Sequence, residues 1–311
     1  MINENLTEFY GKPVIDFYAG KPLPNTTATA YRVRVDWEDF DNKVTFTDRF
    51  DALLTDPGAG GLEALIIGDW GGAGQGEDVG AVIAALVKAK DRLPNLKALF
   101  IGDMVSEESE ISWIEQGDLS ALWPAYPNLE EFGARGGNNL SLGDMALPQL
   151  KKLVVEAGGL PPNVLEEIAN ASLPQLEHLE LWLGTTEYGG DTAIDDVRLI
   201  LNASCFPKLR YLGLRNSEIA DDIAALVGGS KIAGQLSVLD LSLGTLTDKG
   251  AEALASAGNL GGLQKLDIHY HFISQEVLGR LREIGVALDA SDPQEPDEYG
   301  GELHYYVAVS E

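Results

Sequence analysis

A short apolar pattern, apolar-x-x-apolar-x-apolar, recurs along the chain. Its eight copies begin at Leu62, Leu96, Leu129, Leu150, Leu176, Leu209, Leu236 and Leu263, at steps of 21 to 34 residues. A proline or a glycine stands two residues before each copy. Such a short apolar run after a breaker favours a strand over a helix. In "LEHLELWLG" (176–184), Leu179 and Leu181 then point into the core, and Trp182 points to the other face of the strand.

Helical patterns lie between the predicted strands. They are clearest in "EDVGAVIAALVKAKDRL" (77–93), "TDKGAEALASAG" (247–258) and "SQEVLGRLREIG" (274–285), and Ser274 is the predicted N-cap of the last. A unit of one strand and one helix cannot bury its apolar side alone, so neighbouring units stack. The pattern predicts a solenoid with a parallel concave sheet and outer helices.

The copy "LSVLDLSLGTLTDKGAEALA" (236–255) resembles the ribonuclease-inhibitor type of leucine-rich repeat. The chain also resembles a family of bacterial cytoplasmic leucine-rich-repeat proteins of unassigned function. The stretches that carry this resemblance are "SEESEISWI" (106–114), "LEHLELWLGT" (176–185), "LGLRNSEIAD" (212–221) and "YVAVSE" (306–311). The resemblance implies an α/β horseshoe with non-repeat caps at both ends, and it implies no particular activity.

The outermost units of a solenoid need caps, because they would otherwise expose core and a strand edge. We expect an N-terminal cap over residues 1–60, about eight repeats over 61–290, and an acidic loop with a capping strand over 291–311. In the first region, 30–37 alternates as a strand does, and 46–54 reads as a helix capped by Thr47. Residues 285–291 read as a ninth strand, and 302–309 as a final strand that closes the edge.

The charge of −27 narrows the choice of partners. It repels nucleic acid and anionic membranes, and it favours a basic protein or peptide. A single cysteine, Cys205, rules out an intramolecular disulfide. No signal peptide is visible at the N-terminus, and the apolar stretch 79–89 is too short to span a bilayer. We therefore expect a cytoplasmic location.

The sequence contains none of the common catalytic motifs: it has no P-loop, no G-x-G-x-x-G after a strand, no C-x-x-C and no G-x-S-x-G. The glycine-rich stretch 68–78 lacks the Lys-Ser/Thr of a phosphate loop and reads as a flexible strand-to-helix loop. We expect no cofactor and no enzymatic activity. The alternative is a metal-dependent protein or enzyme, since Asp267, His269 and His271 alternate and can share a face. His271 falls in the turn after the strand, which weakens this alternative.

Outward positions of the first two repeats are small or apolar: Ala64, Ile66, Ala98 and Phe100. A patch of this kind is usually covered, either by the chain itself, which we favour, for example by one of the tryptophan-bearing loops, or by a partner. The acidic insertion 103–118 carries six acids and no base, and Trp113 and Ile114 are expected to anchor it to the body. It is either a surface insertion or a partner-binding loop.

Outward positions of the later repeats carry the candidate binding residues. They are His178, Glu180, Trp182, Tyr211, Arg215, Arg135, Glu156 and Asp240. Trp182 and Arg215 occupy the same position of adjacent strands and are expected to be neighbours, able to stack as a cation–π pair. Tyr, Trp and Arg are enriched in binding hot spots. The sequence favours a non-catalytic module that binds a protein or peptide on its concave face, although the same residues also fit a solvated surface.

Overall fold

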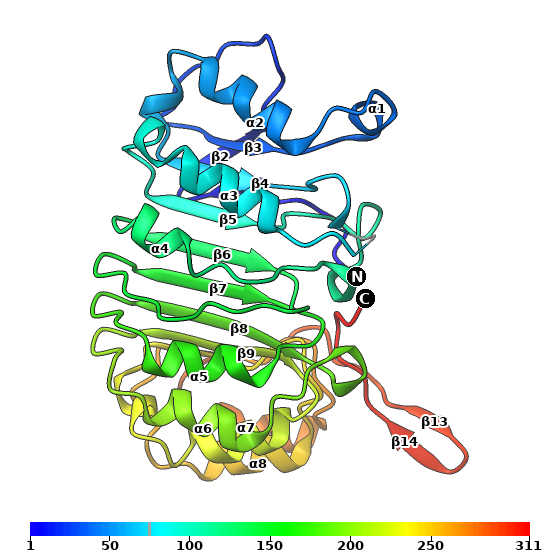
Figure 1. Ribbon diagram of the computed structural model, residues 1–311. Helices are drawn as coiled ribbons and strands as arrows, with labels where there is room; N and C mark the ends of the chain where they lie inside the picture. The colour runs from blue at the N-terminus through cyan, green and yellow to red at the C-terminus, as the bar shows by residue number, and fades with distance from the viewer. Residues whose placement is uncertain (74–75) are drawn as a thin grey trace. The chain divides into compact units, whose positions relative to one another are not determined.

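The computed structural model describes residues 1–73 and 76–311, and it shows an α/β protein with a long, mostly parallel sheet (Figure 1). Twelve strands follow one another in the sheet in chain order, and a separate two-stranded hairpin comes last. Nine α-helices lie in the described part of the chain. Over those same ranges, no helix is long and apolar enough to cross a membrane. Residues 74–75 of the glycine-rich stretch lie outside the described residues.

The chain divides into two compact units, which are described separately. Unit 1 comprises Met1–Val155, Ala171–Pro174 and Glu311. Its strands are β1 (Glu8–Phe9), β2 (Lys12–Asp16), β3 (Ala30–Val33), β4 (Ala64–Ile67), β5 (Ala98–Ile101), β6 (Glu131–Arg135) and β7 (Lys152–Glu156), of which the last residue belongs to unit 2. Its helices are α1 (Trp37–Asp41), α2 (Phe46–Thr55), α3 (Gly80–Lys88) and α4 (Leu122–Ala125). Strand β1 is antiparallel to β2, and the pairs from β2 to β6 are parallel.

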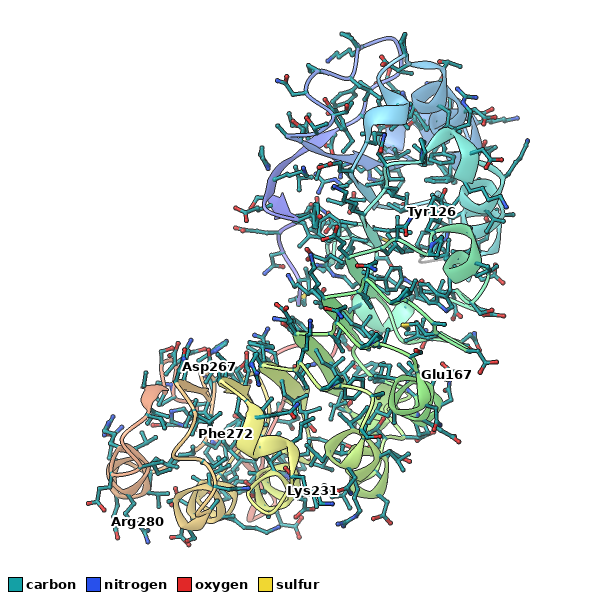
Figure 2. All side chains as sticks on the ribbon, turned by 90° about the vertical axis from the view of Figure 1, so that its left-hand side faces the viewer. Tyr126, Glu167, Lys231, Asp267, Phe272 and Arg280 are labelled. Carbon is teal, nitrogen blue, oxygen red and sulfur yellow. The ribbon has the colours of Figure 1, made fainter. Side chains whose placement is uncertain are left out.

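Unit 2 comprises Glu156–Asn170 and Gln175–Ser310. Its parallel strands are β8 (His178–Gly184), β9 (Tyr211–Ser217), β10 (Val238–Asp240), β11 (Lys265–Asp267) and β12 (Ala287–Asp289). Its helices are α5 (Pro162–Asn170), α6 (Ile194–Asn202), α7 (Ala220–Val227), α8 (Asp248–Ser256) and α9 (Gln275–Arg282). Strands and helices form two layers within the unit, as the labelled Asp267 on β11 and Arg280 on α9 show (Figure 2).

All eight predicted strands are present, as β4 to β11, and each begins two residues after the first leucine of its copy. Those eight leucines are between 0% and 6% exposed, so they form the repeating part of the core. The next two apolar positions of a copy are also buried, as Leu179 and Leu181 of β8 show. The helix predicted in 77–93 is α3, and Ser274 is the N-cap of α9, where its hydroxyl accepts from the backbone N–H of Val277. The ninth strand is β12.

Two predictions at the ends of the chain were wrong. Helix α2 is capped by Thr45, not Thr47, because Thr45 and Asp48 form a reciprocal capping box around its first turn. Of 302–309, only β14 (Glu302–His304) is a strand, and it pairs antiparallel with β13 (Asp297–Tyr299) instead of with the sheet edge. The cause is the turn Gly300-Gly301, in which both residues have positive φ, 66° and 87°.

The last residues of the chain return to the repeat layer of unit 2. The backbone N–H of Ala308 donates to the Leu243 carbonyl at 2.9 Å. The side chain of the fully buried Asn216 bonds both the N–H and the carbonyl of Val309. Asn216 has φ +52°, a left-handed conformation that asparagine tolerates better than most residues. The Asn216 side chain and the Leu243 carbonyl therefore both hold the C-terminal segment in place.

The apolar patch of the first repeats is covered by the chain itself. Ala64, Ile66, Ala98 and Phe100 form one buried cluster with Phe9 and Ala30, and Leu6, Tyr10 and Val14 pack against it. The Phe9 and Phe100 rings meet edge to face at 6.0 Å. The cover is the N-terminal segment, not one of the tryptophan-bearing loops. In the insertion 103–118, Ile114 is buried as expected, but Trp113 is 59% exposed, so it is not the anchor that the sequence predicted.

Candidate functional site

The strand face of unit 2 gathers six of the eight predicted binding residues, because β8, β9 and β10 are parallel and in register. His178 lies opposite Tyr211, and Trp182 lies opposite Arg215. Gly213 lies between Glu180 and Asp240 in the adjacent strands. A Cβ at Gly213 would come within 3.2 Å of the Glu180 Cγ, so the glycine leaves the room that the neighbouring side chains use. The strand-face cluster, as we call it, comprises His178, Glu180, Trp182, Tyr211, Arg215 and Asp240.

Glu180 is the centre of the hydrogen bonds in the strand-face cluster. Its Oε1 accepts from Trp182 Nε1 at 2.8 Å and from Arg215 Nη1 at 2.6 Å. Its Oε2 contacts His178 Nε2 at 3.3 Å and the Tyr211 hydroxyl at 3.4 Å. With 9% of its surface exposed, the carboxylate is nearly desolvated, and these partners compensate for the lost water.

Asp240 is the second buried carboxylate of the strand-face cluster. It accepts from the Tyr211 hydroxyl at 2.6 Å, and its Oδ2 lies 3.4 Å from Arg215 Nε. The same Nε donates to the Ser242 hydroxyl at 2.9 Å. Arg215 is therefore shared by two carboxylates, and the cluster holds its own charges in place.

The protonation states follow from these contacts. Burial alone would raise the pKa of Glu180, but the His178 hydrogen bond and the Arg215 charge outweigh it and lower the pKa to about 2. The pKa of Tyr211 is raised, first by burial and then by the negative charges of Glu180 and Asp240. At neutral pH Glu180 is a carboxylate and Tyr211 is a phenol that donates its proton.

Two ring contacts give the strand-face cluster a partly exposed aromatic surface. The rings of His178 and Tyr211 stack at 3.8 Å between centroids, with 4° between their planes. The Arg215 guanidinium carbon lies 5.2 Å from the Trp182 ring centroid, as a cation–π pair. Each of these four side chains is partly exposed. The rings are fixed by hydrogen bonds from their polar atoms, so one part of each is presented to solvent in one conformation.

The other two predicted binding residues lie elsewhere and are buried. Arg135, on β6, is 3% exposed, and its Nη1 contacts the Met104 carbonyl at 2.6 Å and Asp103 at 3.3 Å. Glu156, at the end of β7, is 9% exposed. The charged groups of Arg135 and Glu156 are therefore buried, whereas the rings of the strand-face cluster are partly exposed.

The predicted metal residues are only partly brought together. Asp267 and His269 lie within reach of Asp289, with donor atoms within 4.8 Å of one another. His271 was wrongly grouped with them: it is fully buried, and its nitrogens contact the Ala290 carbonyl and the Ile273 N–H. The ammonium of Lys265 already contacts Asp267 at 2.7 Å and Asp289 at 3.3 Å. A metal would have to displace this lysine.

A buried ionic network in unit 1 was not predicted. Asp103 is fully buried and accepts from Arg32 Nη1 at 2.7 Å and from the Leu6 N–H at 3.1 Å. Arg32 also donates to Asp16 at 2.6 Å. The network ties the N-terminal segment to the end of β5. Asp103 is the second residue after β5 and stands in an acidic stretch, so nothing in the sequence distinguishes it from the acids at the surface.

The fold and the strand-face cluster define an α/β repeat protein in which a parallel sheet is built in chain order. No family model matches the sequence, and a search of curated proteins finds no match. Among solved structures, the chain is similar to the crystal structure of a protein from Bacteroides fragilis, a structural genomics target. The two are 32% identical with a TM-score of 0.80, over 89% of this chain and 76% of that one. The chain belongs to the same family as this Bacteroides fragilis protein.

Proposed function

We propose that this protein is a non-catalytic binding module, and that the strand-face cluster is the surface on which it holds a protein or peptide. The observation that carries the proposal is the rigid presentation of Trp182, Tyr211, His178 and Arg215. Interfaces concentrate their binding energy in Trp, Tyr and Arg side chains. Rings that are already fixed lose little conformational entropy when a partner packs on them.

The proposal includes a finer description of the fold, a leucine-rich-repeat solenoid of the ribonuclease-inhibitor type with its strands on the concave face. Eight leucine-led strands in chain order support it. It also includes a cytoplasmic location, which the single, partly buried Cys205 supports, because extracellular domains of this kind often use disulfides. The favoured partner is basic, because the protein carries a charge of −27.

A metal-dependent function at Asp267, His269 and Asp289 is the second candidate, supported by the proximity of their donor atoms. It is weaker for a physical reason. Lys265 supplies a positive charge to both carboxylates, which reduces the attraction that a divalent cation would experience. We therefore retain the binding module as the conclusion.

The test is co-purification from the native host with three tagged forms: the wild type, Trp182→Ala and Trp113→Ala. Trp113 is a matched control because it is an exposed tryptophan of the other unit. We expect at least one protein to co-purify with the wild type and with Trp113→Ala, and to be depleted with Trp182→Ala. Identical sets of proteins for all three forms would contradict the proposal, provided that circular dichroism shows each form folded.

A further inference from the structure

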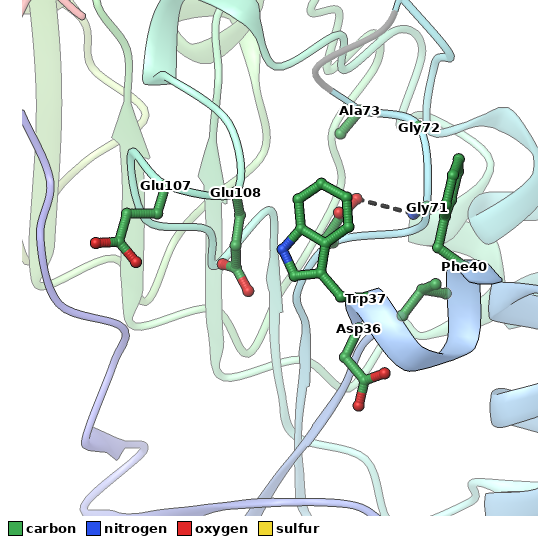
Figure 3. Close-up of a pocket in the computed structure, with 10 residues that line it drawn as sticks. Asp36, Trp37, Phe40, Gly71, Gly72, Ala73, Glu107 and Glu108 are labelled. Carbon is green, nitrogen blue, oxygen red and sulfur yellow. Dashed lines mark hydrogen bonds between the residues drawn. The ribbon is translucent and has the colours of Figure 1, made fainter.

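A pocket of about 270 Å³ belongs to unit 1, whereas the strand-face cluster belongs to unit 2. It lies between α1, the loop that follows β4, and the acidic insertion (Figure 3). Pockets for drug-sized ligands are typically 300–1,000 Å³, so this volume suits the end of one side chain or a small head group.

The pocket is lined by aromatic and acidic side chains. Trp37 and Phe40, both on α1, are 80% and 50% exposed, and their rings meet edge to face at 6.5 Å. The carboxylates are those of Asp36, Asp69, Glu107 and Glu108, and no lysine or arginine is among the described lining residues. Figure 3 shows the Trp37 indole between Phe40 and the two glutamates of the insertion. An indole of this exposure offers its π face, which attracts cations.

Asp69 is a partly buried carboxylate of the pocket, and the backbone fixes it. Its Oδ1 accepts from the Gly71 N–H at 2.8 Å. Gly71 has φ +94°, which a side chain would strain, so this glycine allows the loop to turn back over the carboxylate. The pKa of Asp69 is nevertheless raised, first by burial and also by the negative charge of Glu108. The loop amides therefore do not fully compensate the charge of this carboxylate.

The positive charge of Arg34 is shared between Glu108, one of the lining carboxylates, and Asp16. Its Nη1 contacts Glu108 at 2.8 Å, and its Nη2 contacts Asp16 at 3.0 Å. An anionic ligand would be repelled by the four lining acids, and a purely apolar ligand would desolvate them without compensation. A cation satisfies both the carboxylates and the indole face.

We propose that this pocket binds the cationic end of a basic side chain, a guanidinium or an alkylammonium, against the Trp37 ring and the Asp69 carboxylate, with the charge of the exposed Glu107 at its rim. The bound group places its charge against the acids and its flat or methylene surface against the indole. This site is separate from the strand-face cluster, so the two proposals stand or fall independently. It gives the acidic protein a specific contact for one basic residue of a partner.

The experiment follows the Trp37 indole N–H in proton–nitrogen correlation spectra of the full chain, with Trp37→Phe used to assign it. The probes are N-acetyl-arginine amide and its neutral isostere, N-acetyl-citrulline amide. We expect saturable shifts with the arginine probe and none with citrulline. The affinity should fall as NaCl rises from about 0.02 M to about 0.2 M, because exposed charges are then screened. A third probe, the capped peptide Gly-Arg-Gly, distinguishes two sources of the cation. If the peptide binds more tightly than N-acetyl-arginine amide, the site recognises a polypeptide. If the two bind equally, the site recognises a small free cation.

Variants of exposed residues test the contacts without disturbing the core. Trp37→Ala should weaken the arginine probe about tenfold, and Glu107→Gln about twofold to threefold, since Glu107 is exposed. Both are followed by calorimetry. Trp113→Ala, also an exposed tryptophan of unit 1, should leave the affinity unchanged. Equal binding of the citrulline probe, no binding of the arginine probe, or an equal loss in Trp113→Ala and Trp37→Ala would each overturn the proposal.

Discussion

At the scale of single residues, Glu180 holds the strand-face cluster together. Its two carboxylate oxygens contact four side chains, each of which is aromatic or cationic: His178, Trp182, Tyr211 and Arg215. The sequence could place Trp182 beside Arg215, because strand alternation and equal spacing from the leucines fix both positions. It could not identify Glu180 as the centre, since that depends on rotamers and on the space left by Gly213. Asp103 was missed for a similar reason: nothing local separates a buried aspartate from exposed ones.

The first prediction concerns Glu180→Gln. A neutral amide leaves the Arg215 charge in the cluster with one carboxylate fewer, so we expect the free energy of unfolding at pH 7 to fall by about 3 kcal/mol. The folded pKa of Glu180 is lowered to about 2 from 4.5, so its stabilising effect is present above pH 4.5 and is lost as the pH falls toward 2. The difference between wild type and variant should therefore shrink across this range.

Urea unfolding at a series of pH values measures this difference. Glu187→Gln is the control, because Glu187 is an exposed glutamate of the same unit. Its stability should follow the wild type at every pH. A deficit for Glu180→Gln that stays constant from pH 7 to about pH 3 would show that the charge of Glu180 is not the stabilising feature.

At the scale of elements, the predicted strands were confirmed because their signal is local. A breaker, two leucine-type positions and an alternation all lie within a few residues, and each copy repeats them. The ends were predicted less well. Two features depend on contacts between residues far apart in the chain. One is the pairing partner of the strand in 302–309, and the other is the cover that the N-terminal segment forms over β4 and β5. An alternating pattern identifies a strand without identifying its partner.

The second prediction concerns this N-terminal cover. Phe9→Ala removes a ring that packs edge to face on Phe100, and we expect it to cost about 3 kcal/mol. The loss should be local at first. The Leu6 N–H, which donates to Asp103, should exchange its hydrogen much faster than in the wild type.

Hydrogen exchange followed by mass spectrometry measures the release of the segment, and denaturant unfolding measures the cost. Ile15→Ala serves for comparison, because Ile15 lies on β2 but is 48% exposed. We expect it to change neither quantity appreciably. If Phe9→Ala left exchange at residues 5–10 as slow as in the wild type, the segment would be held by something other than the apolar cluster.

At the scale of the whole molecule, the charge of −27 and the two candidate surfaces point to the same kind of partner. The strand-face cluster offers rigid rings beside buried carboxylates, and the pocket of unit 1 offers an indole beside acids. Each favours a basic polypeptide with exposed apolar or cationic side chains. The charge was evident from composition alone, whereas the pocket was not, because its residues come from three separate stretches of the chain.

The measurement that tests the central claim most directly is binding of peptides selected from a random phage-displayed library on the wild-type protein. We predict that the selected peptides are basic, bind less tightly at higher salt, and lose about thirtyfold or more in affinity with Trp182→Ala, as for a hot-spot residue. Trp113→Ala should bind them as the wild type does. Selected peptides that bind Trp182→Ala as tightly as the wild type, or a selection that enriches none, would contradict the account.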